Sequence, residues 1–156
     1  MQDINRWVVV TLLLAALPTL AYAGAGKSIG KDSGIVPVHL EAIPGSNIKK
    51  VVLTADAAKR CGIVIVPVQE LQVPPKRKAS GTVTRRVVPY ASIIYTPDGG
   101  EWVYTNPSSL VYVRERITIA YIDGDIAVLT AGPDAGVQVV TTGVVELYGA
   151  EFGVGH

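Results

Sequence analysis

The stretch Val88–Val145 decides the fold, and it opens VPYASIIYTPDGGEWVY (Val88–Tyr104). Short apolar runs rich in Val, Ile and Tyr alternate with turn signals throughout this stretch, as is typical of strands. Pro97-Asp98-Gly99-Gly100 separates the first two runs, because proline presets φ and glycine supplies positive φ. Asp123-Gly124 lies between two later runs and is a strong hairpin signal. The pattern predicts a mainly β fold, a small β-barrel or β-roll built from Val88–Gly143.

Composition supports one folded domain without a global charge. The chain has 156 residues, of which 49% are hydrophobic and 17% charged, so we expect a packed core. A net charge of +1 provides no general attraction for nucleic acid, and no nucleic-acid-binding motif is present. Cys61 is the single cysteine, which excludes an internal disulfide and a CxxC metal or redox site. We expect no cofactor.

The N-terminal residues, 1–23, resemble a cleavable signal peptide in their order of features. Arg6 gives a positive start, Trp7–Leu17 is apolar and uncharged, and Ala21-Tyr22-Ala23 offers small residues where signal peptidase cleaves. This interpretation predicts export to a periplasm. The alternative is an uncleaved anchor in the inner membrane, although Pro18 interrupts an apolar length that is near the lower limit for spanning a bilayer.

The residues between the leader and the predicted β domain contain two segments. Residues 24–47 are expected to form a flexible N-terminal arm, in which the alternation around Val38 leaves one edge strand open. Residues 48–86 predict a β–short-helix–β segment. Thr54 can cap the single short helix, which Gly62 would end, and apolar runs flank it on both sides.

The second half of the chain resembles the membrane-proximal domain of periplasmic adaptor proteins, the membrane fusion proteins of tripartite efflux and secretion systems. The matching residues are Val88–Ile94, Asp98-Gly99, Trp102–Tyr104, Val113-Arg114, Arg116–Ile119, Gly124, Val128, Gly132, Gly136, Val139-Val140 and Gly143. Residues Thr54–Ile63 resemble the start of the β-barrel domain of the same family. The resemblance therefore implies a membrane-proximal-like β domain over residues 87–156.

The chain departs from that family after Gly81-Thr82-Val83. In the family, a Gly-x-Val pair leads into a lipoyl-like domain and a long α-helical hairpin, and this chain has neither. The resemblance implies a non-enzymatic periplasmic protein that docks to an inner-membrane transporter or to a fuller adaptor subunit. It leaves contact with the membrane surface and oligomer formation open.

Seven basic residues are candidates for the docking surface: Lys76, Arg77, Lys78, Arg85, Arg86, Arg114 and Arg116. The first five surround one predicted strand, where they can form either a solvated edge or a patch for an acidic partner or anionic lipid. The last two flank Glu115 and form either a cross-strand charge ladder or a partner-facing strip. Strand alternation places Arg114 and Arg116 on one face and Glu115 on the core-side face.

Residues with catalytic or metal-binding chemistry are few and scattered. His39 and His156 are the only histidines, and neither lies in a metal-binding motif, although a two-ligand site with Cys61 stays open. The Gly-rich tail that ends at His156 is expected to pack or dock. We find no nucleophile elbow and predict no enzyme. The alternative function is a periplasmic ligand- or metal-handling β module with a pocket at the mouth of the barrel.

Overall fold

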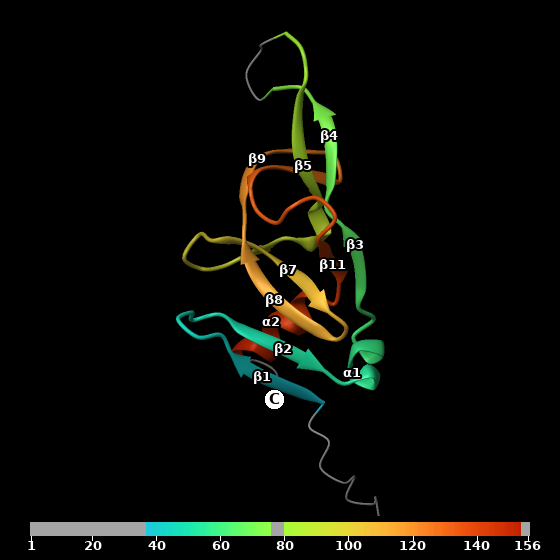
Figure 1. The fold of residues 1–156 in the computed structure, drawn as a ribbon, viewed down its shortest axis with the longest axis vertical. Helices are drawn as coiled ribbons and strands as arrows, with labels where there is room; N and C mark the ends of the chain where they lie inside the picture. The colour runs from blue at the N-terminus through green and yellow to red at the C-terminus, as the bar shows by residue number, and fades with distance from the viewer. Residues whose placement is uncertain (1–36, 76–79, 154–156) are drawn as a thin grey trace, which may run out of the picture. The chain divides into compact units, whose positions relative to one another are not determined.

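The structure is a computed structural model that describes residues 37–75 and 80–153. Within these ranges the strands form two antiparallel sheets (Figure 1). The larger sheet has the order β1-β2-β8-β7-β11-β3, and β6 also pairs with β7. Its strands are β1 (Val38–Ala42), β2 (Lys49–Leu53), β3 (Val64–Pro67), β6 (Ile94–Tyr95), β7 (Glu101–Ser108), β8 (Val111–Arg116) and β11 (Gln138–Thr142).

The smaller sheet has four strands in the order β4-β5-β10-β9. They are β4 (Gln69–Val73), β5 (Val83–Pro89), β9 (Thr118–Asp123) and β10 (Ile126–Ala131), and the 3₁₀ turn η1 (Tyr90–Ser92) follows β5. Buried side chains from both sheets form one shared core, which contains Val68, Val88, Val103, Ile117, Ala127, Leu129 and Val139. The chain passes from one sheet to the other at Ile117, whose amide donates to the Glu101 carbonyl at 2.9 Å.

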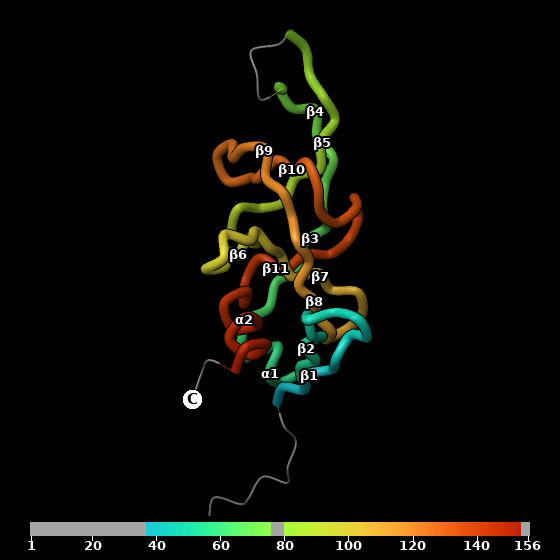
Figure 2. Tube along the Cα trace, turned by 90° about the vertical axis from the view of Figure 1, so that its left-hand side faces the viewer, coloured from blue at the N-terminus to red at the C-terminus, as the bar shows by residue number. Residues whose placement is uncertain are grey.

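Two helices pack against the other face of the larger sheet (Figure 2). Helix α1 (Ala55–Arg60) begins after Thr54, whose hydroxyl accepts a hydrogen bond from the Ala57 amide. Helix α2 (Val144–Phe152) begins at Gly143 and ends at Gly153. The core on this face contains Val51, Leu53, Ala57, Ala58, Tyr104, Tyr112, Val140, Val144 and Leu147. The larger sheet is therefore covered on both of its faces.

The local predictions compare well with these elements. The mainly β class is confirmed, as are the β2–α1–β3 segment and the hairpin at Asp123-Gly124. The predicted arm contains strand β1, so the edge strand that the sequence left open is present. β1 pairs with β2. Helix α2 was not predicted, because the tail was interpreted only from its glycines. The predicted signal peptide lies outside the described residues.

Candidate functional site

A buried group of three polar side chains joins helix α2 to the larger sheet. Glu151 on α2 is 4% exposed and Arg114 on β8 is 9% exposed. Their side chains form an ion pair, with Arg114 Nε 3.2 Å from Glu151 Oε2 and Arg114 Nη2 donating to Oε1 at 3.3 Å. The hydroxyl of Tyr104 on β7 donates to Glu151 Oε2 at 2.5 Å. The three residues therefore hold a charge pair that is largely shielded from water.

Burial keeps the Tyr104 hydroxyl protonated, and the buried Nε of Arg114 has no hydrogen-bond partner among the described residues. Burial raises the pKa of Tyr104 far above its ordinary value, and the hydrogen bond to Glu151 raises this pKa further. Tyr104 therefore stays a neutral donor at physiological pH. The Nε of Arg114 lies near Glu151 Oε2, but its N–H is not directed at that oxygen, so the described residues give it no hydrogen-bond partner. The Arg114 guanidinium is therefore ion-paired with Glu151 without being fully hydrogen-bonded.

Two aromatic rings lie within cation–π distance of the Arg114 guanidinium. Its central carbon lies 4.2 Å from the ring centroid of Trp102 and 4.9 Å from that of Phe152. Arg116 lies 5.7 Å from the Trp102 centroid. Tyr148 packs on Phe152, with ring centroids 4.6 Å apart. Guanidinium groups are attracted to aromatic faces at these distances, and this attraction strengthens when the pair is desolvated.

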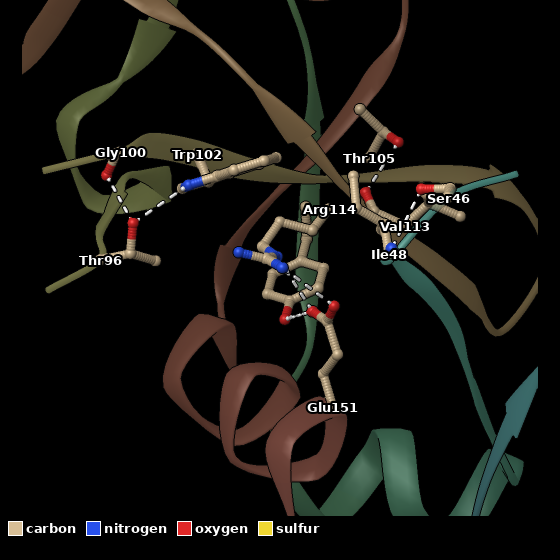
Figure 3. A network of polar contacts seen from close by, with 10 residues as sticks. Ser46, Ile48, Thr96, Gly100, Trp102, Thr105, Val113, Arg114 and Glu151 are labelled. Atoms are coloured by element: carbon tan, nitrogen blue, oxygen red, sulfur yellow. Dashed lines mark hydrogen bonds and ion pairs between the residues drawn. The ribbon is translucent and has the colours of Figure 1, made fainter. Parts of the chain in front are cut away.

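The orientation of Trp102 is fixed by the turn between β6 and β7. Its indole Nε1 donates to Thr96 Oγ1 at 3.2 Å, and Thr96 Oγ1 donates to the Gly100 carbonyl at 3.1 Å (Figure 3). A Cβ at Gly100 would lie 2.5 Å from the Trp102 nitrogen and 2.7 Å from Thr96 Oγ1, so only glycine fits there. The turn that the sequence predicted therefore has a second role, because it positions the indole ring.

The outer side of this stack forms a surface that we name the arginine–aromatic face, consisting of Trp102, Arg116 and Phe152. Arg116 is exposed, Trp102 is half-buried and Phe152 is 49% exposed. The buried Arg114–Glu151 pair lies beneath the face. Arginine and large aromatic side chains are the residues most enriched at the centres of protein interfaces. The buried Glu151 carboxylate and Tyr104 hydroxyl are hydrogen-bonded to each other. The arrangement is therefore suited to binding a partner through surface contacts.

Of the two alternatives for Arg114 and Arg116, a charge ladder or a partner-facing strip, the structure does not allow a strip that includes Arg114, so Arg114 is not an exposed docking residue. The two side chains do share a face of β8, but α2 covers the part that contains Arg114. Only Arg116 remains exposed. Glu115 lies on the opposite face and is half-buried, as alternation predicted. Burial raises the pKa of Glu115, and the nearby carboxylate of Asp134 raises it further.

Two further predicted docking residues, Arg85 and Arg86, lie on β5. Arg86 donates from Nη1 to the carbonyls of Gly132 and Pro133, at 2.6 and 3.1 Å, and pairs with Asp134 at 2.9 Å. This side chain therefore stabilises the turn after β10, and it is half-buried. Arg85 is exposed. Lys76, Arg77 and Lys78 lie outside the described residues, as does His156.

The candidate metal ligands do not form a cluster in the described part of the chain. His39 is exposed on β1, and Cys61 is the half-buried residue that follows α1. Residues 37–75 and 80–153 hold no group of three His, Cys, Asp or Glu side chains arranged for a metal ion. Within the same ranges, no helix has both the length and the apolar character needed to cross a membrane.

Glu151 is the site residue that sequence reasoning missed. A usable signal was present, because Val144, Leu147 and Glu151 follow the i, i+3, i+7 spacing of one helix face.

Comparison of the chain with models of protein families, with curated proteins and with solved structures finds no match.

Proposed function

We propose that this chain is a non-enzymatic periplasmic protein of adaptor type, which docks to an inner-membrane transporter or to a fuller adaptor subunit. The observation that supports docking is the arginine–aromatic face. Arg116 and Phe152 are exposed on it, while the buried pair beneath holds Arg114 against the inner sides of the rings. A rigid aromatic surface loses little side-chain freedom on binding, so more of its contact energy remains as affinity.

The kind of partner follows from the charge of this face and from the resemblance. Arg116 makes no ion pair with another described side chain, so it favours a partner with an acidic group opposite it. The resemblance to the membrane-proximal domain of adaptor proteins supports a transporter or adaptor subunit as that partner. The mechanism would be geometric, with turns and strands presenting a fixed surface and no chemical step.

Photo-cross-linking in intact cells tests this function. A photoreactive amino acid at Phe152 would lie on the proposed surface, while one at Ile122, which is 46% exposed on β9, serves as the matched control. We expect a transporter or adaptor subunit to be captured from Phe152 and not from Ile122, and Arg116→Glu to reduce that capture. Equal capture from both positions, or a chain that stays in the cytosol, would contradict the proposal.

A further inference from the structure

The smaller sheet carries an open groove, away from the arginine–aromatic face, of about 350 Å³. It lies between the end of β4 and the start of β5 on one side and strands β9 and β10 on the other. Its walls include Pro74, Val83, Arg85, Ile119, Tyr121 and Thr130. This volume is at the lower end of the range for small-molecule sites.

The groove exists because the four-stranded sheet curls until its two edge strands approach. β4 and β9 are the end strands of this sheet, yet the Tyr121 hydroxyl on β9 donates to the Pro74 carbonyl after β4 at 2.6 Å. Val73, Val87 and Val128 are buried on the inner face of the curl. A further strand placed between β4 and β9 would have to break the Tyr121–Pro74 bond. The groove therefore favours a small molecule over a strand from a second chain.

The chemistry of the walls is asymmetric. Pro74, Val83 and Ile119 give apolar contact, whereas Arg85 places an exposed guanidinium at the groove. Arg85 makes no ion pair with another described residue, and the described lining includes no acidic side chain. A guanidinium binds a carboxylate through two parallel hydrogen bonds. An apolar channel with one unpaired cation among its described lining residues complements a molecule that has an apolar body and one anionic end.

We propose that this groove binds a small amphipathic carboxylate, with the carboxylate on Arg85 and the apolar body along Val83 and Ile119. At about 30 Å³ for each group the size of a water molecule, the groove accommodates a chain of roughly ten carbons. This proposal deepens the ligand-handling alternative and is independent of docking, because the groove and the arginine–aromatic face share no residue.

Decanoate is a suitable probe, used with the isotope-labelled full chain in NMR titrations. We expect saturable shifts of the Ile119, Tyr121 and Thr130 amides. Arg85→Gln should raise the dissociation constant about five- to tenfold, and decanol, which lacks the charge, should bind the native chain more weakly by a similar factor. The matched control Arg60→Gln removes an exposed arginine at the end of α1, outside both the groove and the arginine–aromatic face, and should leave binding unchanged.

Three outcomes would overturn the proposal. The amides of the groove could fail to shift, the shifts could lie elsewhere, such as at Trp102, or Arg85→Gln could bind decanoate as the native chain does. Chemical shifts remote from residue 85 report whether the variant is folded. A second variant, Thr130→Val, keeps the volume of the wall and should preserve binding within about twofold, because the Thr130 hydroxyl already donates to the Thr118 carbonyl at 3.2 Å.

Discussion

Replacing Glu151 by leucine should destabilise the fold strongly, because it leaves Arg114 buried without a counter-charge. Glu151 is 4% exposed and accepts from both Arg114 and Tyr104. Removing one partner of a buried ion pair costs about 3–5 kcal/mol. A domain of this size has a total unfolding free energy of about 5–15 kcal/mol, so this one change removes a large share of it.

The same reasoning predicts that replacing all the polar partners restores stability. Buried ion pairs exchanged for apolar residues of similar volume are often neutral or stabilising. The triple variant Glu151→Leu, Arg114→Leu and Tyr104→Phe leaves no charge or hydroxyl unpaired in the core. We expect its unfolding free energy to lie within about 1–2 kcal/mol of the native chain, although its leucine does not recover the ring contacts of Arg114.

Urea unfolding monitored by Trp102 fluorescence measures both variants, because this indole contacts Arg114. Glu41→Gln is the control, since its ion pair with Lys50 is 3.7 Å long with side chains 47% and 44% exposed. The control should change the unfolding free energy by less than about 1 kcal/mol. The reasoning would be refuted if Glu151→Leu behaved like this control, or if the triple variant lost the sum of the single losses.

Three further perturbations have defined outcomes. Gly143→Ala should lower the unfolding free energy by more than Gly136→Ala, since both positions have positive φ but only at Gly143 would a Cβ collide with Ile63; urea midpoints measure both losses. Glu115→Gln should raise stability by a few tenths of a kcal/mol at pH 7, because the raised pKa of Glu115 makes its ionised form unfavourable in the folded state; this gain should vanish below about pH 4 in matched unfolding curves. The raised pKa of Tyr104 stabilises the fold fully below about pH 10, the unfolded pKa, and less as pH rises beyond it; Tyr104→Phe should therefore show a shallower loss of stability between pH 9 and 11.

Local signals in the sequence predicted helix α1 and several of the strands and turns, whereas the order of the strands depended on contacts that the pattern does not contain. Thr54 and Gly62 mark the ends of a helical turn through cap and φ preferences that act within a few residues. Asp123-Gly124 does the same for a hairpin. The pairing of β2 with β8 and of β3 with β11 joins segments far apart in the chain, and similar apolar runs can pair in many orders.

Helix α2 was missed for a physical reason that also explains the error at Arg114. Gly149 lowers the helix propensity of this short segment, and the charged Glu151 interrupts the apolar pattern of its buried face. Glu151 is buried only because Arg114, 37 residues earlier, neutralises it. Neither residue predicts its own burial alone, so strand alternation assigned Arg114 to the surface.

The buried pair also explains how the exposed rings of this surface are held in place. Trp102 is fixed on one side by Thr96 and on the other by the Arg114 guanidinium, which Glu151 holds in place. Phe152 lies one residue after Glu151, so the ion pair fixes the end of α2 and the position of this ring together. Ordering a side chain on binding costs about 0.5–1.5 kcal/mol. Under the docking proposal, the ion pair therefore contributes to affinity because part of that ordering is already complete in the free protein.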